Sequence, residues 1–416
     1  MTLKNAHSIT TLFHHKPGIY YGYIIVLICF IMLVFGWGLF YNYGIFFGSL
    51  EQTFGWSRAL TSGALSLSVL VSGFSGIVAG RLSDRFGPKT VIIFCAVFLA
   101  AGYGLMATVQ NAWQLYAIYG TFIAFGIGGF WSPQVSTIAR WFKGRRGLMT
   151  GIVSGGIGFG TLVSPPLLTQ LITAYDWRLT YIIIGSSILV IVVVAAQFIK
   201  YSPSPVGQSV VNTSERNKNP WPEVEGYSLP RAMRTWQFWM VAIIYLCFGL
   251  VQLTVMVHVV PYATGLGISA IAAAGILSVI GGVSLAARII IGYIADHLNT
   301  KISIVICLAM MTTSSLVLLF SDSLWKLYLF AVLFGIGYGG LSCLQSLVAA
   351  ELYGLAALGV LTAIFGFGFD IGGAIGPVLA GHLFDINRSY NWAFIICFIV
   401  ALSALVIGIF LKPTKK

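Results

Sequence analysis

Long apolar runs separated by short polar breaks make up most of this 416-residue chain. A helix needs about 20 apolar residues to cross the ~30 Å hydrocarbon core of a bilayer. Backbone polar groups in lipid must find partners within their own segment, so each run of that length is predicted to be a transmembrane α-helix. Twelve spans are expected, at residues 20–48, 59–80, 90–108, 113–139, 147–173, 178–200, 236–261, 269–294, 302–320, 325–350, 356–383 and 391–411.

One long polar insert divides the twelve runs into two groups of six. It is rich in Ser, Pro, Asn and charged residues. We therefore expect an N-terminal six-helix bundle over 1–200, a linker over 201–234 and a C-terminal six-helix bundle over 235–416. A Gly-x-x-x-Asp pattern ends both the second and the eighth spans, at Gly80–Asp84 and Gly292–Asp296, which favours two related halves.

Composition supports an all-α membrane protein. Hydrophobic residues make up 58% of the chain and charged residues only 8%, which excludes a water-soluble globule. The formal net charge of +12 does not indicate a nucleic-acid partner, because the basic residues lie in short runs between spans. Of the 23 lysines and arginines, 18 fall in one set of alternate loops and four in the other, which predicts that both termini and the insert are cytoplasmic. Six scattered cysteines indicate no metal site, and we expect no cofactor.

The loop after the second span runs from Gly80 to Lys89 and reads Gly-Arg-Leu-Ser-Asp-Arg-Phe-Gly-Pro-Lys. It resembles the signature loop of the major facilitator superfamily, and six spans, an insert and six spans surround it as in that family. The resemblance implies a gating latch between the two halves. The alternative is that these charges only set the topology. The expected gating residues are Gly80, Asp84, Arg85, Gly87 and Lys89.

Several other stretches resemble the monocarboxylate transporter family and the bacterial oxalate–formate exchangers. They include Tyr20–Tyr23, Phe54–Arg58, Arg140–Phe142, His258–Ala263 and Gly372–Pro377. The resemblance implies a functional monomer in a bacterial inner membrane that carries a lactate- or pyruvate-like monocarboxylate by alternating access, with proton symport. The chain shows neither a nucleotide-binding loop nor a nucleophile–base set, and we expect no enzymatic activity.

Two ionisable residues fall well inside predicted spans, Arg288 and Asp370. A charge at mid-membrane costs at least ~2.5–3.5 kcal/mol on insertion scales and usually faces a partner or a cavity. The planar fork of an arginine can bind a carboxylate through two hydrogen bonds. The resemblance adds that the family's span-eight arginine, which aligns with Arg288, binds the substrate carboxylate. The alternative is that Asp370 neutralises Arg288 permanently. Asp370 is also a candidate for proton coupling, because it would take up a proton if arriving substrate displaced it from the arginine.

His258, near the outer end of the seventh span, is the second candidate for proton coupling, because an imidazole changes charge near neutral pH. A simple hydrogen bond at the outer mouth is the alternative. Polar side chains in spans one, four, eight and ten correspond to the positions that line the cavity in the fold this chain resembles, although helix packing would also explain them. These residues are Tyr41, Asn42, Tyr119, Ser284 and Tyr338, and with Arg288 and His258 they make up the candidate substrate-binding set.

The chain departs from the family at several functional positions. Animal monocarboxylate transporters have a lysine in span one and an aspartate one turn before the span-eight arginine, where this chain has Tyr41 and Ser284. A carboxylate anion exchanger of the oxalate–formate type therefore stays open as an alternative to symport, as does a metabolite or drug exporter. Phe365 stands where the oxalate carriers have a second cation, which favours a monoanion over a dianion.

Overall fold

The computed structural model of the chain describes residues 21–142, 146–200, 227–295, 300–354 and 358–412. Most of the linker predicted over 201–234 lies outside these ranges. Nearly every described residue is helical, and twelve helices are long and apolar enough to cross a membrane, which confirms the predicted count.

The first six spans contain the helices α1 to α8. The first and fourth spans are each built from two α-helices joined by a π-helix, η1 or η2. The bounds are α1 Tyr21–Leu33, η1 Val34–Gly38, α2 Tyr43–Phe54, α3 Arg58–Phe86, α4 Pro88–Met106, α5 Ala112–Ala117, η2 Ile118–Ile123, α6 Ala124–Trp141, α7 Arg146–Tyr175 and α8 Trp177–Gln197.

The last six spans follow a short helix, α9, and each is one uninterrupted helix. Their bounds are α9 Leu229–Met233, α10 Trp236–Gly265, α11 Ala270–Ala295, α12 Thr300–Leu319, α13 Leu324–Tyr353, α14 Leu358–Asn387 and α15 Asn391–Phe410.

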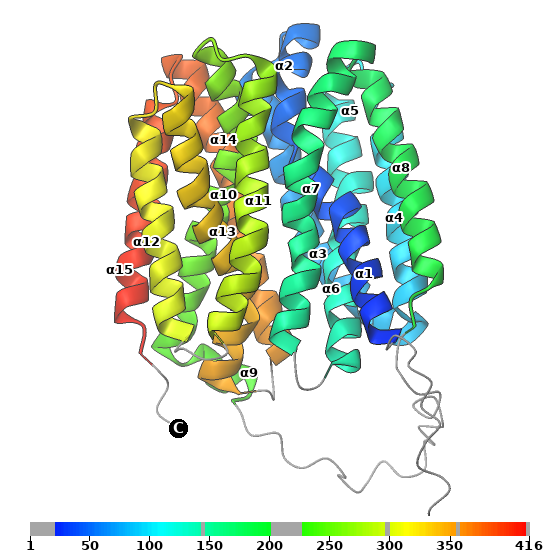
Figure 1. The fold of residues 1–416 in the computed structure, drawn as a ribbon, viewed down its shortest axis with the longest axis vertical. Coiled ribbons are helices and arrows are strands. Elements are labelled where there is room, and N and C mark those ends of the chain that lie inside the picture. The colour runs from blue at the N-terminus through cyan, green and yellow to red at the C-terminus, as the bar shows by residue number, and fades with distance from the viewer. Residues whose placement is uncertain (1–20, 143–145, 201–226, 296–299, 355–357, 413–416) are drawn as a thin grey trace, which may run out of the picture.

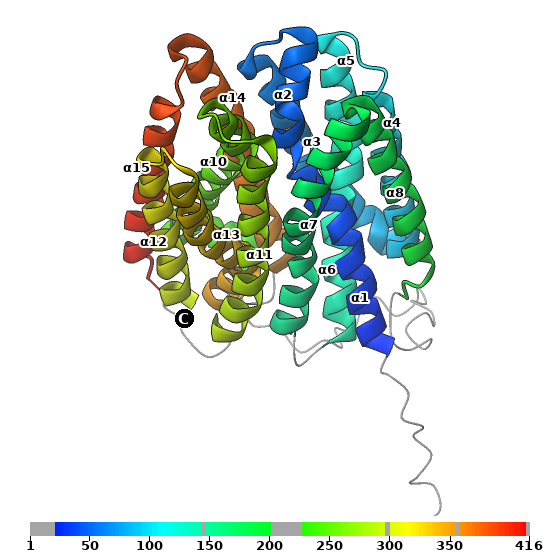
Figure 2. The same ribbon diagram turned by 45° about the horizontal axis from the view of Figure 1, so that its top comes forward.

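The two groups of six spans lie side by side (Figure 1). They meet mainly where α7 packs on α11 and α3 packs on α14, and α2 also contacts α10. In both views the start of α1 and the C-terminus lie at the same end of the bundle (Figures 1 and 2). We call the opposite end, where α2 ends and α3 begins, the distal end.

Small residues allow α7 and α11 to approach closely. A Cβ at Gly158 of α7 would lie 2.8 Å from the carbonyl oxygen of Gly281 and 2.9 Å from the hydroxyl of Ser284, both on α11. Such distances leave no room for a side chain, so backbone packs directly on backbone across the boundary between the two groups. The glycines of α7 therefore serve contact with the other group of spans.

The first span differs from the prediction, because it runs to Phe54 and is interrupted in the middle. The π-helix η1 leads into a turn at Tyr41 and Asn42 before α2 begins. The amide nitrogen of Asn42 donates to the carbonyl of Gly38 and to the hydroxyl of Ser164 on α7, at 2.6 Å each. Asparagine side chains compete in this way with helical backbone hydrogen bonds, and the result is irregular backbone at mid-span.

We expect Gly158→Ala to lower the melting temperature of the purified protein, because the new methyl group must displace α11. Overpacking of this kind typically costs about 1–3 kcal/mol. Gly104→Ala in α4 is the matched control, since no atom lies within 4 Å of its Cβ position. Thermal unfolding in detergent measures both variants, and equal melting temperatures would show that α7 and α11 can separate without cost.

Candidate functional site

Arg288 lies in the middle of α11 with only 1% of its surface exposed. Its Nε atom has no hydrogen-bond partner, and no described residue forms an ion pair with it. Its nearest described stabilising contact is with the ring of Tyr338 on α13, whose centroid lies 5.0 Å from the guanidinium carbon. A cation–π contact offsets only part of the cost of burying a charge. Arg288 is therefore a buried cation without an anion among the described residues.

The ion pair between Arg288 and Asp370, which the sequence left open, is not formed. Asp370 instead lies against α3, with its Oδ2 atom 2.5 Å from the place where a Cβ of Gly73 would stand. It is partly exposed. The ion pair does not form because α14 is rotated so that the Asp370 carboxylate faces the first six spans. Asp370 therefore belongs to the contact between the two groups of spans.

Aromatic rings from both groups of spans pack in a row that reaches Arg288 through Tyr338. Tyr41, at the interruption of the first span, packs edge-to-face on Tyr338 with ring centroids 6.3 Å apart. Trp37 of η1 lies 5.5 Å from Tyr41. The hydroxyl of Tyr338 and the indole nitrogen of Trp37 have no hydrogen-bond partner among the described residues. Two further hydrogen-bonding groups thus lie unpaired on the rings that pack against Tyr41.

Gln252 of α10 is a member of this cluster that the sequence analysis missed. It is 1% exposed and lies beside the hydroxyl of Tyr41. Neither atom of its amide has a hydrogen-bond partner within the part of the chain that the structure describes. The available signal was a lone glutamine in the apolar sequence around Val251 and Leu253, but a search for ionisable residues passes over an amide. We call Tyr41, Gln252, Arg288 and Tyr338 the central site.

The other predicted binding residues lie at different distances from the central site. Asn42 follows Tyr41 directly, and its amide nitrogen already donates to Gly38 and Ser164 at the helix interruption. Ser284, one turn before Arg288, donates its hydroxyl to the carbonyl of Gly281. Tyr119 lies within the first six spans, where its hydroxyl is 3.3 Å from that of Tyr181. The structure thus brings together Arg288, Tyr41 and Tyr338, and it places Tyr119 in a separate aromatic cluster.

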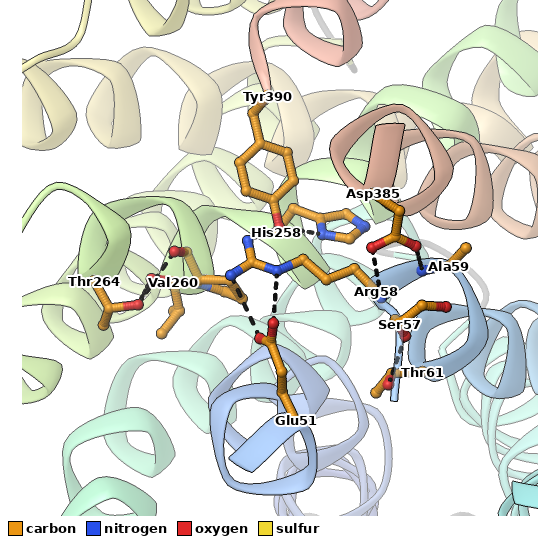
Figure 3. A network of polar contacts seen from close by, with 11 residues as sticks. Glu51, Ser57, Arg58, Ala59, Thr61, His258, Val260, Thr264, Asp385 and Tyr390 are labelled. Atoms are coloured by element: carbon orange, nitrogen blue, oxygen red, sulfur yellow. Dashed lines mark hydrogen bonds and ion pairs between the residues drawn. The ribbon is translucent and has the colours of Figure 1, made fainter. Parts of the chain in front are cut away.

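A second polar cluster joins the two groups of spans at the distal end (Figure 3). The guanidinium of Arg58 pairs with Glu51 at 3.4 Å and donates to the hydroxyl of Tyr390 at 2.7 Å. It also stacks on the ring of Phe384, 3.7 Å from the centroid. We call Glu51, Arg58, His258, Asp385 and Tyr390 the distal network.

Asp385 of α14 caps the first turn of α3 from the other group of spans. Its two carboxylate oxygens accept the backbone N–H groups of Arg58 and Ala59 at 3.0 and 2.9 Å, while Ser57 accepts the N–H of Leu60. Helix N-termini carry unpaired N–H groups and a partial positive charge, so a carboxylate is well placed there. The cap therefore ties α14 to α3 at the distal end.

His258 uses both ring nitrogens in the distal network. Its Nε2 lies 2.9 Å from the carbonyl of Pro377, which can only accept, so Nε2 carries the proton. Its Nδ1 lies 3.0 Å from the hydroxyl of Tyr390. Burial raises the pKa of Tyr390, although Arg58 opposes this, so the hydroxyl stays protonated and donates to Nδ1. A chain of donors thus runs from Arg58 through Tyr390 and His258 to Pro377, and it requires a neutral imidazole.

The sequence model of the Major Facilitator Superfamily matches residues 26–360 and 284–416. This chain belongs to the major facilitator superfamily. It is a multi-pass membrane transporter, and the relatives it matches are transporters rather than enzymes.

Relatives of this major facilitator transporter include monocarboxylate transporters at low identity. Monocarboxylate transporter 2 of Homo sapiens is 25% identical and covers 94% of this chain and 86% of that protein. Monocarboxylate transporter 12 of Rattus norvegicus is 24% identical, with coverages of 95% and 86%. The uncharacterized MFS-type transporter YhjX of Escherichia coli is 26% identical, with coverages of 84% and 85%.

Solved structures support the fold of this major facilitator transporter. A bacterial homologue of the human lysosomal transporter Spinster, inward-facing and unoccupied, aligns with a TM-score of 0.68 at 14% identity. The alignment covers 96% of this chain and 95% of that one. At this identity the likeness concerns the fold alone.

The predicted gating loop of the transporter joins α3 to α4 at the end opposite the distal network. α3 ends at Phe86, its C-cap Gly87 has a positive φ of 83° that suits glycine, and Pro88 begins α4. Gly80 faces α6, since its Cβ would lie 3.0 Å from the hydroxyl of Ser132. Arg85 and Lys89 are exposed, and the side chain of Asp84 lies outside the described part of the chain. A latch role for this loop stays a prediction.

We expect Asp385→Asn in this transporter to speed hydrogen exchange at the backbone amides of Arg58 and Ala59. The amide keeps only one acceptor oxygen and loses the charge that complements the helix N-terminus. Asp322→Asn is the control. Asp322 is an exposed aspartate at the same end of the bundle, and it pairs locally with Lys326, four residues later at the start of α13. Hydrogen-exchange mass spectrometry compares them, and unchanged exchange in Asp385→Asn would contradict the capping role.

Proposed function

We propose that this protein carries a small lactate- or pyruvate-like monocarboxylate across a bacterial inner membrane, by proton symport and alternating access. One observation carries the proposal, namely the buried guanidinium of Arg288 without an anion among the described residues. A carboxylate bound there would supply the missing countercharge and two hydrogen-bond acceptors. The similarity to monocarboxylate transporters points to the same substrate class.

The surroundings of Arg288 favour a single negative charge. Phe365, which stands where the oxalate carriers have a lysine, is fully buried among aromatic side chains, with its ring 5.4 Å from Phe238. A second carboxylate would find no second cation in the central site, and an unpaired buried charge costs several kcal/mol. A monocarboxylate therefore fits better than a dicarboxylate.

The position of the central site supports alternating access. It contains Tyr41 from the first six spans and residues of α10, α11 and α13 from the last six, so substrate would lie between two six-helix domains, 1–200 and 235–416. The distal network holds the same two domains together at one end. If positive loop charge marks the cytoplasm, the distal end faces outward and the network is an outer gate.

Asp370 is the better placed candidate for the transported proton. It lies at the contact of the two domains against Gly73, and both it and Arg288 are within electrostatic reach of Tyr41. An anion arriving at Arg288 would cancel the nearby positive charge, which favours uptake of a proton by the carboxylate. His258 is the second candidate, because protonation would break the chain of donors through Tyr390.

We expect Arg288→Ala to abolish uptake of labelled lactate at ordinary concentrations. Removing one partner of a buried pair typically costs about 2–5 kcal/mol, or ~30-fold to several thousand-fold in affinity. Arg288→Lys keeps the charge but loses the planar fork, so its binding should also weaken severely. Lactate binding to purified protein and uptake into proteoliposomes measure both effects.

Arg234→Ala is the matched control, since that arginine is exposed and lies outside the central site. Each variant must show the melting temperature and monodispersity of the parent before its binding is compared. A well-folded Arg288→Ala protein that binds lactate within a few-fold of the parent would place the carboxylate anchor elsewhere.

Acid-stimulated uptake distinguishes the two proton candidates. We expect uptake by the parent to rise as the outer pH falls, because symport binds a proton with each substrate. Asp370→Asn should flatten this dependence, whereas His258→Gln should retain most of it. Initial uptake rates at several outer pH values, with inner pH constant, provide the measurement. Full pH dependence in both variants would show that neither residue couples protons, and a parent without pH dependence would favour anion exchange.

A further inference from the structure

Gln252 is the least explained polar group in the core of the last six spans. Its side chain is 1% exposed and both amide atoms lack partners in the described part of the chain. A buried amide without hydrogen bonds costs about 1–3 kcal/mol. A hydrogen bond with the neighbouring hydroxyl of Tyr41 would engage only one of the two atoms. The remaining hydrogen-bonding capacity needs another explanation.

The location of Gln252 explains this remaining hydrogen-bonding capacity. Tyr41 lies beside Gln252, and its ring packs on Tyr338, which in turn lies under Arg288. Tyr41 thus links the amide on α10 with the guanidinium on α11, since Gln252 lies beside its hydroxyl and Arg288 is within electrostatic reach of it. A ligand whose carboxylate reaches Arg288 would extend its adjoining carbon atoms toward Tyr41 and Gln252.

We propose that the Gln252 amide forms a hydrogen bond with a hydroxyl or carbonyl group next to the substrate carboxylate. This hydrogen bond would narrow the substrate to short hydroxy- or oxo-monocarboxylates. This inference rests on the proposed function, because it takes Arg288 as the carboxylate anchor. An amide offers both donors and an acceptor, so it pairs equally with a hydroxyl and with a carbonyl. An unsubstituted acid such as propionate would leave the amide unpaired in a buried place.

Sites that hydrogen-bond a substrate group discriminate strongly against analogues that lack it. The parent should therefore bind lactate at least about tenfold more tightly than propionate, which differs from lactate only by a hydroxyl. Pyruvate should resemble lactate.

The test compares lactate, pyruvate and propionate binding to the purified full-length protein and to Gln252→Met. Methionine keeps the length of the side chain but has no comparable donor or acceptor. We expect the lactate-to-propionate ratio to fall from about tenfold or more to within about threefold, because lactate loses its hydrogen bonds to the amide and propionate no longer leaves an amide unpaired. Measurable propionate binding shows that the variant folds and keeps the carboxylate anchor.

Gln252→Glu gives an independent readout if Gln252→Met folds poorly. The added carboxylate would compete for Arg288, so binding of all three acids should weaken together at a pH where it is ionised. Equal loss of lactate and propionate in Gln252→Met would show that Gln252 only positions the site, and an unchanged ratio would show that it does not contact substrate. Either result overturns the inference. If instead no acid binds the parent, the proposed function itself fails.

Discussion

The charge of Arg288 in the middle of α11 is the constraint on which the account depends. A guanidinium cannot lose its proton at accessible pH, and its burial is costly unless an anion and hydrogen bonds compensate it. In this chain the described compensation is the face of one tyrosine ring. The rest of the central site follows from this constraint, since the helices around Arg288 must leave space for the compensating group.

The packing of the two groups of spans explains how the residues of the central site come together. Glycines let α7 and α11 meet along their backbones, while the interruption of the first span brings Tyr41 toward Tyr338. At the distal end a carboxylate of α14 caps α3 and Arg58 reaches Tyr390. Small-residue contacts can slide, whereas hydrogen bonds between charged groups form or break in discrete steps. This combination suits a carrier with two alternative arrangements of its domains.

Much of the fold could be predicted from the sequence, because lipid imposes both the length and the apolar character of a spanning helix. The importance of Arg288 was also predictable from the cost of a charge in a span. Whether Arg288 pairs with Asp370 stayed open at that point, because hydropathy does not reveal the rotation of α14 that turns Asp370 toward Gly73. Gln252 was missed because an amide carries no charge. The distal network was missed because Arg58 and Asp385 are 327 residues apart in the chain.

The most direct measurement is an experimental structure of the protein with lactate bound, at a resolution that separates the carboxylate from the rest of the ligand. The account predicts the lactate carboxylate within hydrogen-bond distance of the Arg288 guanidinium, between the domains and beside Tyr41 and Tyr338. Lactate bound elsewhere, with Arg288 paired to a carboxylate of the protein itself, would contradict it.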